Sequence, residues 1–205
     1  MPRNDRYRRA MTVADTAASG LHPEAYSAAQ RRVLAAALDL FAEHGVSGTS
    51  LQMMADEIGV TKAAVYHQFR TKEQIVLAVA EVEMARLDVA VTEAEAAGRG
   101  AEAREVLLSR VISMAVERRR WVNALSGDPV MIRLLGTHQP FLDLMDRLYS
   151  VLLGDEAGTT AVVQIAIVSA AIGGAVVHPL LAGLDDETLE AELLQVTRRL
   201  FDLPT

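Results

Sequence analysis

The sequence predicts an all-α protein, with an N-terminal unit of three helices followed by a larger helical domain. Three observations support this fold class. Apolar residues make up 51% of the 205 residues but aromatic residues only 4%, and alanine and leucine dominate, which favours packed helices. Ser27, Thr49 and Thr71 are each followed three residues later by Gln, a pattern typical of a helix N-terminus. Apolar residues then recur at helical spacing, and no segment reads as a β-strand.

Residues 1–26 are predicted to be a disordered arm. They carry four arginines but lack the apolar run of a signal peptide, and Met11 is an alternative start of the chain. The first helix is predicted over residues 27–44 and ends at Gly45. Its apolar stripe consists of Leu34, Ala37, Leu38 and Phe41.

A short helix and a tight turn are predicted next. Thr49 is the expected N-cap of this helix, with Gln52 closing a capping box. Gly59 follows at the position where a left-handed residue usually ends a helix, and Val60 can fill the corner behind it. The apolar face of the helix consists of Met54, Ala55 and Ile58.

A second short helix is predicted to follow the turn. Thr61 caps it, and Val65 and Phe69 form its inner face. Small, basic and hydroxyl-bearing side chains remain on the other faces, namely Lys62, Ala63, Ala64, Tyr66 and His67. A helix that presents such residues from its N-terminal end suits the DNA major groove. The pair is therefore predicted to be a helix-turn-helix with residues 61–67 as recognition helix.

The distribution of charge agrees with this interpretation. The whole chain has a net charge of −7, but residues 1–72 carry nine Lys and Arg against seven Asp and Glu, whereas residues 73–205 carry eleven against twenty. The first part is therefore net positive and the second part strongly negative, so the second part can repel DNA while the first binds it. The absence of cysteine excludes disulfides and thiolate metal sites, and indicates a reducing cytoplasm.

A long helix over residues 71–97 is predicted to connect the two parts. At ~1.5 Å per residue it spans on the order of 40 Å. Its apolar stripe consists of Val76, Ala80, Met84, Leu87 and Val91. The remaining helices are predicted over residues 101–120, 140–153, 159–177 and 186–201, with short helices between residues 121 and 136. The arginines at 118–120 end one of them, where the helix dipole favours cations, and we prefer this explanation to an anionic-ligand site.

Residues 158–184 contain no charged side chain and are long enough to cross a bilayer. Acidic residues lie on both sides, at 155–156 and 185–187, and no basic anchor or aromatic belt is present. This pattern favours a buried protein–protein helix over membrane insertion. A single-pass membrane protein with a helix-turn-helix stays as an alternative hypothesis.

Residues 30–77 resemble the tetracycline-repressor (TetR) family of transcriptional regulators. Several spaced elements agree in order: Leu40 and Phe41 with Gly45, Thr49 with Ser50, Ala55 before Gly59 and Val60, Thr61 with Lys62, the run from Val65 to Phe69, and the run from Lys72 to Ile75. The resemblance covers about a quarter of the chain. It implies an all-helical homodimer, with a helix-turn-helix DNA-binding domain over 27–72 and a ligand-binding and dimerisation domain over 73–205.

The resemblance also implies which residues meet DNA. By position, phosphate contacts correspond to Thr49, Ser50, Thr61, Tyr66, His67 and Lys72, and base-facing places to Lys62, Ala63 and Ala64. The family often has Gly and then Thr or Ser after the Lys, where this chain has Ala63 and Ala64. Two methyl groups can contact thymine methyls but donate no hydrogen bond. Direct base reading is therefore expected to be sparse, with Lys62 and DNA shape carrying more of it.

An effector pocket and a dimer interface are likewise implied. The pocket would hold a small effector of unknown identity among Met84, Met114, Trp121, Leu125, Met131, Phe141 and Met145. The last two long helices of each subunit would form a four-helix interface, which involves Ala166, Ala170, Gly173, Gly174, Leu189, Leu193, Val196 and Leu200. The resemblance thus predicts a cytoplasmic repressor that binds double-stranded operator DNA with inverted-repeat symmetry and does not enter a membrane.

Other functions are less well supported by the residues. The five histidines are scattered, and neither a metal-binding helix motif nor a Gly-rich phosphate loop is present, so no cofactor, metal or catalytic site is expected. An enzyme or carrier built on a helical bundle stays as the second hypothesis. Taken singly, Thr61 is a helix cap with or without DNA, Tyr66 could pack on a neighbouring helix, and His67 could simply face solvent.

Overall fold

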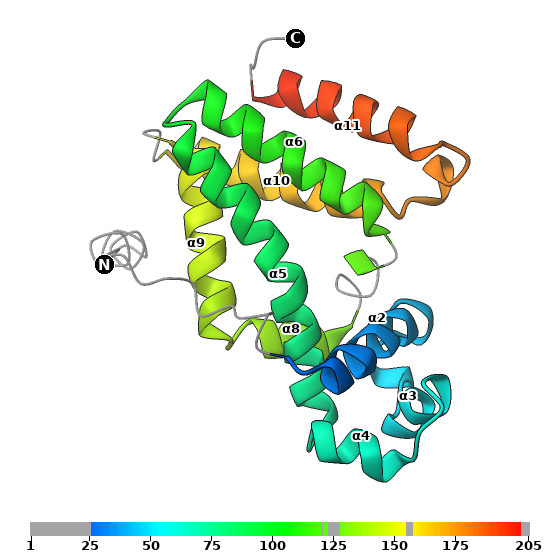
Figure 1. The fold of residues 1–205 in the computed structure, drawn as a ribbon. Coiled ribbons are helices and arrows are strands. Elements are labelled where there is room, and N and C mark those ends of the chain that lie inside the picture. The colour runs from blue at the N-terminus through cyan, green and yellow to red at the C-terminus, as the bar shows by residue number, and fades with distance from the viewer. Residues whose placement is uncertain (1–25, 120, 123–127, 155–157, 202–205) are drawn as a thin grey trace.

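The computed structural model describes residues 26–119, 121–122, 128–154 and 158–201, and in these ranges it is helical without strands. The predicted all-α fold is confirmed (Figure 1). The elements, in chain order, are α2 (Ala28–Gly48), α3 (Leu51–Glu57), α4 (Lys62–Gln68), α5 (Lys72–Ala96), α6 (Ala101–Glu117), α8 (Pro129–Leu135), α9 (Gln139–Leu153), α10 (Thr159–Ala175), the 3₁₀ turn η2 (Pro179–Leu181) and α11 (Asp186–Leu200).

The first three helices form a separate small unit at the lower end of the molecule (Figure 1). Phe41 of α2, Met54 of α3 and Val65 of α4 are fully buried where these helices meet. Gly59 has a φ of 68° in the turn between α3 and α4, a left-handed conformation that glycine adopts at no steric cost. The predicted helix-turn-helix is therefore present, with its corner at the predicted glycine.

The N-cap of α3 is Ser50, not Thr49 as the sequence suggested. The Ser50 hydroxyl accepts from the Met53 N–H at 3.2 Å. The chain kinks at Gly45, whose φ is 70°, and this kink turns Thr49 inward. There its hydroxyl donates to the carbonyls of Gly45 and Leu40, at 2.8 and 3.2 Å. Thr49 is thus buried, and its hydroxyl fixes the C-terminal end of α2.

Two of the three predicted capping boxes are incomplete. Only Ser27 forms the reciprocal pair, with Gln30. Thr71 caps α5 by accepting from the Gln74 N–H, but the Gln74 side chain accepts from Arg70 instead of Thr71. Serine or threonine predicts where each helix begins to within a residue, whereas the side chain three residues on has several possible partners.

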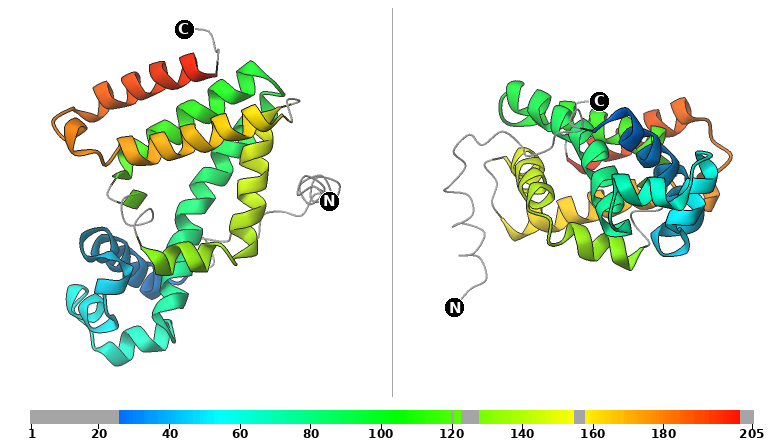
Figure 2. Two further views of the ribbon diagram at one scale, coloured as in Figure 1. Left: turned by 180° about the vertical axis from the view of Figure 1, so that it is seen from behind. Right: turned by 60° about the horizontal axis from the view of Figure 1, so that its bottom comes forward.

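The long helix α5 connects the small N-terminal unit to the larger helical domain. It rises from the small unit and packs against α2 and α8 at one end and against α6 and α9 along the rest of its length (Figures 1 and 2). The predicted stripe is largely confirmed, because Val76, Ala80, Met84 and Val91 are buried and Leu87 is half-buried. The α10 and α11 helices both contact α6, and they contact each other.

Helix α6 ends at Glu117, three residues before its predicted end. Arg118 is its C-cap residue and forms a two-pronged ion pair with the largely buried Glu83 of α5, at 2.6 and 3.1 Å. Arg119 pairs with Asp186 at the start of α11, at 2.9 Å. These two arginines therefore tie helices together, in agreement with a structural role. Arg120 lies outside the described residues.

Tyr26, which the sequence assigned to the arm, is anchored. Its ring lies 6.3 Å from that of Phe69, and its hydroxyl donates to Glu81 of α5 at 2.6 Å. Burial and the neighbouring Glu81 carboxylate both raise the pKa of Tyr26. Glu81 also faces His138, the N-cap residue of α9, at 3.2 Å. One carboxylate of α5 therefore contacts both Tyr26, which precedes α2, and His138, which precedes α9.

Within the described ranges, no helix combines the length and the apolar character that crossing a membrane requires.

Candidate functional site

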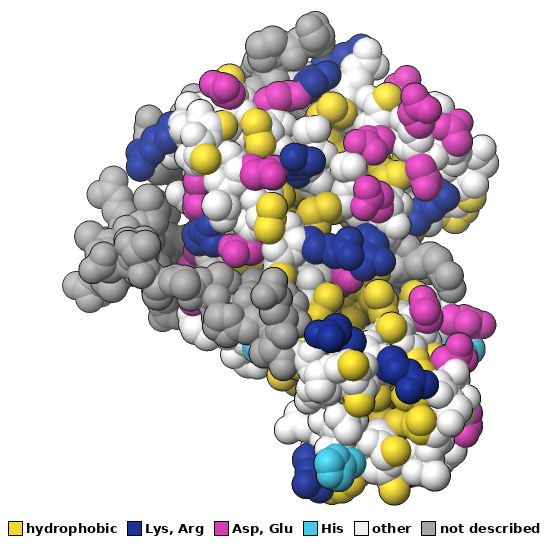
Figure 3. All heavy atoms as spheres, in the orientation of Figure 1, with side chains coloured by type: hydrophobic (Ala, Val, Ile, Leu, Met, Phe, Trp, Pro, Cys, Tyr) yellow, Lys and Arg dark blue, Asp and Glu magenta, His cyan; other side chains and the backbone are white. Residues whose placement is uncertain are grey.

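The exposed face of α4 is the candidate DNA-binding surface. Thr61 caps the helix by accepting from the Ala64 N–H at 3.2 Å, and Val65 and Phe69 hold it to the small unit from inside. The predicted outward residues Lys62, Ala63, Ala64, Tyr66 and His67 are all exposed. A histidine and basic side chains lie together at the lower end of the molecule in Figure 3. The helix is thus anchored on one side and free to meet a partner on the other.

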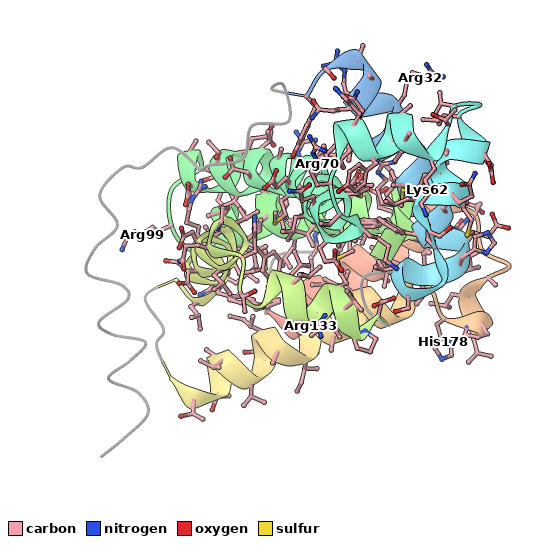
Figure 4. All side chains as sticks on the ribbon, turned by 90° about the horizontal axis from the view of Figure 1, so that it is seen from below. Arg32, Lys62, Arg70, Arg99, Arg133 and His178 are labelled. Atoms are coloured by element: carbon pink, nitrogen blue, oxygen red, sulfur yellow. The ribbon has the colours of Figure 1, made fainter. Side chains whose placement is uncertain are left out.

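An arginine that the sequence analysis missed belongs to this surface. The Arg70 guanidinium lies 5.4 Å from the centre of the Tyr66 ring, an attractive cation–π arrangement. Both residues are exposed, Tyr66 at 48%. Figure 4 shows Lys62 and Arg70 on the same unit, seen from below. The i, i+4 spacing of Tyr66 and Arg70 was the available signal, although α4 ends at Gln68.

Arg32 was also missed. It projects from α2 in Figure 4, and its guanidinium donates to the Ile58 carbonyl at 3.0 Å, at the C-terminal end of α3. A cation at a helix C-terminus is favoured by the helix dipole. Arg32 therefore fixes the turn that precedes α4 and leaves a positive charge at the surface beside it.

Two of the residues aligned with phosphate contacts are differently placed. Thr49 is 2% exposed and its hydroxyl donates to two backbone carbonyls, so we do not assign a phosphate contact to it. Lys72 is half-buried, and its ammonium donates to the carbonyls of Val46 and Thr49, at 2.9 and 3.1 Å. It closes the end of α2 in the present structure. Ser50 is exposed, and its hydroxyl proton remains available to an acceptor.

The comparisons with known proteins identify this unit. Residues 33–79 match the family described as "Bacterial regulatory proteins, tetR family". These residues belong to the tetR family. The match spans α3, α4, most of α2 and the start of α5, and the tetR-family unit therefore coincides with the candidate surface.

Named relatives share the tetR-family unit. The chain is 33% identical over 64 residues to the HTH-type transcriptional repressor AcnR of Corynebacterium diphtheriae, which is 31% of this chain and 34% of AcnR. It is 36% identical over 69 residues to the HTH-type transcriptional regulator RutR of Escherichia coli K12, 34% of this chain and 32% of RutR. The chain thus matches about a third of the length of these relatives.

The whole fold has solved counterparts. AibR, in complex with isovaleryl coenzyme A and operator DNA, superposes with a TM-score of 0.62 at 17% identity, covering 82% of this chain and 97% of AibR. At this identity the likeness establishes the fold alone. It extends the comparison from the tetR-family unit to the larger helical domain.

The predicted effector residues come from α5, α6, α8 and α9 and from Trp121, and α5 packs against each of the other three helices. Met84, Trp121 and Met131 are buried, whereas Met114, Phe141 and Met145 are half-buried. Leu125 lies outside the described residues. In the described part of the chain no cluster of three His, Asp or Glu side chains could hold a metal ion.

The predicted dimer residues divide into two groups. Ala166, Ala170 and Gly174 of α10 are exposed, and so are Val196 and Leu200 of α11. Gly173 and Leu193 are half-buried, whereas Leu189 is 2% exposed and packs inside the subunit. Leu189 therefore belongs to the core of the subunit, where α11 packs against α6 and α10.

An apolar surface runs along α10 and α11. Val162, Val163 and Ile167 of α10 are more than half exposed, although each is a large apolar residue. An apolar groove lies between the two helices and is lined in part by Ile172, Leu184 and Leu193. Neither these valines and isoleucine nor the groove was identified from the sequence, since α10 is apolar all round and its periodicity gives no outward face.

Proposed function

We propose that this protein is a cytoplasmic transcriptional repressor that binds an inverted-repeat operator as a dimer and is released by a small, largely apolar effector. The observation that carries the proposal is the exposed row of α4, presented by a tetR-family unit. The relatives support it by name, since AcnR is a transcriptional repressor and RutR a transcriptional regulator. AibR supports the proposed binding of both DNA and a small effector, because its structure was solved with operator DNA and isovaleryl coenzyme A.

The DNA contacts are assigned to the exposed residues of the small unit. Lys62 reads a base edge, and the methyl groups of Ala63 and Ala64 meet thymine methyls. Ser50, Thr61, Tyr66 and His67 contact phosphates, and Arg70 joins them because its cation–π pairing with Tyr66 holds it beside α4. Lys72 acts by holding the end of α2 in place.

The dimer is assigned to α10 and α11. Exposed apolar surface of this extent marks an interface, and its small residues allow helices to approach closely. A Cβ added at Gly173 or Gly174 would meet nothing within 4 Å in the single subunit, which leaves that face free for a second copy. A two-fold dimer presents two equivalent α4 helices, and its operator is therefore an inverted repeat.

The effector is assigned to the region where α5 packs against α8 and α9. The residues that gather there, among them Met84, Met131, Phe141 and Met145, are apolar or aromatic, and this favours an apolar ligand. Helix α5 passes from this region to the small unit without interruption. A ligand that shifts α5 therefore changes the separation of the two α4 helices.

Selection of bound sites from random double-stranded DNA tests the proposal. The purified full-length protein should enrich one inverted repeat, whereas the matched variant Lys62→Ala should enrich it weakly or not at all. Enrichment of single half-sites would contradict the dimer, and absence of any enriched sequence would remove DNA recognition altogether. Mapping the selected site in the source genome then gives the regulated genes.

A further inference from the structure

A buried carboxylate joins the two parts of the molecule. Asp128 is 7% exposed and is the N-cap of α8, where its Oδ1 accepts from the Val130 N–H at 2.8 Å. Its Oδ2 accepts from the Ser47 N–H at 2.9 Å, 81 residues earlier in the chain. Burial tends to raise the pKa of this carboxyl, but the hydrogen bonds from Ser47 and Val130 outweigh it and lower the pKa. Asp128 is therefore an ionised bridge from α8 to the end of α2.

The Asp128 bridge contacts the short segment that precedes the helix-turn-helix. Residues 45–49 run from the kink at Gly45 to the buried Thr49, and Ser50 then caps α3. Lys72, at the start of α5, holds the Val46 and Thr49 carbonyls of this segment. Asp128 holds its Ser47 N–H from the other side. The position at which α3 begins is thus fixed by one cation of α5 and one anion of α8.

Helix α8 also carries a residue of the predicted effector region. Met131 lies three positions after Asp128 and is fully buried. Because α8 has only seven residues, a shift at Met131 moves its N-terminus as well. A change of packing around Met131 therefore reaches Ser47 through the hydrogen bonding between Asp128 and Ser47, by a route that does not pass along α5.

We propose that Asp128 is a positioning residue that fixes the orientation of the helix-turn-helix relative to the larger domain, through its hydrogen bond to the Ser47 N–H. The effect on DNA rests on the proposed function. DNA accepts one spacing and orientation of the two α4 helices. Without the bridge, residues 45–49 keep the contacts of Lys72 and of the Thr49 hydroxyl but lose the connection to α8. Helices α3 and α4 then sample several orientations, and affinity for DNA falls.

The test uses Asp128→Asn with a matched control. Asparagine caps helices as well as aspartate, so its Oδ1 keeps the bond to Val130 while its NH₂ group faces the Ser47 N–H and cannot accept from it. Asp128→Ser is the second variant, since serine caps α8 but is too short to bridge. Asp185→Asn is the control. Asp185 also caps a helix, α11, and both hydrogen bonds described for its side chain go to Thr188.

Two measurements are made on the full-length protein. Amide hydrogen exchange at residues 45–49 should be about tenfold faster in both Asp128 variants, because the local opening is no longer opposed by the bridge. Affinity for the DNA selected by the wild-type protein should fall about tenfold, within the usual range of coupling between sites. Asp185→Asn should leave both quantities unchanged.

Unchanged exchange at residues 45–49 in both Asp128 variants overturns the proposal, as does faster exchange with unchanged DNA affinity. If Asp128→Asn loses helical circular dichroism, Asp128→Ser decides in its place. If the wild-type protein selects no DNA, the proposed function fails, but the exchange measurement still decides whether Asp128 holds the segment.

Discussion

Lys62 and Tyr66 are the residues whose removal separates base reading from phosphate contact. Both are exposed on α4, and neither holds the helix in place, because Val65 and Phe69 do so. Lys62→Ala should cost about 1–3 kcal/mol of DNA affinity and relax specificity, whereas Tyr66→Phe should weaken binding to all sequences alike. Fluorescence anisotropy with selected and mismatched DNA measures both effects. Wild-type isotherms for both variants, with intact circular dichroism, would place DNA elsewhere.

The Asp128 carboxyl should make the stability of the protein depend on acid. Its pKa is lowered in the folded protein by N–H donors. A depressed folded pKa gives stability that is fully present above the unfolded value, about 3.9, and is lost as pH falls through the folded value. Urea unfolding should therefore show wild type more stable than Asp128→Asn at pH 7, with the difference shrinking below about pH 4. A difference that grows on acidification would contradict the depressed pKa.

The exposed row of α4 was predictable from the sequence because it depends only on helical spacing. Val65 and Phe69 lie on one face, and the exposed residues Lys62, Ala63, Ala64, Tyr66 and His67 lie on the others. Thr49 was misplaced because its burial depends on the kink at Gly45, which turns the chain inward just before α3. Arg70 was missed because its partner, Tyr66, meets it only after the helix has ended. Such placements are decided by tertiary contacts, which spacing does not encode.

At the level of elements, the kink of α2 depends on one glycine. Gly45 has a φ of 70°, and a Cβ there would lie 3.6 Å from Asp128 Oδ2, an ordinary contact. The cost of Gly45→Ala should therefore come from the left-handed backbone, about 1–2 kcal/mol. Gly48→Ala is the control, since its φ is not positive and its Cβ would meet only His44, at 3.5 Å. Thermal unfolding of the two variants compares them, and equal melting temperatures would contradict the strain.

The apolar face of α10 gives a matched pair of substitutions. Ile167 and Val89 are both 58% exposed, the first on α10 and the second on α5. Ile167→Asp places a charge in the proposed interface and should convert the dimer to monomer, because a buried unpaired charge is strongly unfavourable. Val89→Asp makes a similar change at an equally exposed site and should leave the dimer intact. Light scattering at micromolar concentration distinguishes the two, and a dimeric Ile167→Asp would rule out this face.

Some helix boundaries marked by a cap were predicted well, but α2 continues through the kink at Gly45 to Gly48, and α3 is capped by Ser50 instead of Thr49. The bounds of α5 and α11 agree to within a residue, because Thr71 and Asp185 cap them. The end of α6 was placed too late, since the arginines that follow it are good helix formers. Which sides of α6 are buried was also not predictable. Helix α6 contacts α5, α9, α10 and α11, so apolar residues are buried on more than one of its sides, among them Leu108, Ile112, Ala115 and Val116.

For the whole molecule, the proposed coupling between effector and DNA would use two connections. Helix α5 and the Asp128 bridge both connect the small unit to the region assigned to the effector. If the effector weakens DNA binding by some factor, DNA must weaken effector binding by the same factor. A tenfold effect needs about 1.4 kcal/mol of differential affinity, which one buried apolar group can supply.

Filling the interior of the larger domain should imitate the effector. Ala80 of α5 is 2% exposed, one turn before Met84. Ala80→Leu adds three carbon atoms to a packed interior, which costs about 1–3 kcal/mol unless the neighbouring helices move apart. Movement of α5 relieves this cost but changes the separation of the α4 helices, so operator affinity should fall although no DNA-facing residue is altered. Val89→Leu, exposed on the same helix, should bind as wild type does. Undiminished operator affinity in a folded Ala80→Leu would mean that α5 does not transmit packing changes, and the protein would then be a constitutive DNA-binding repressor.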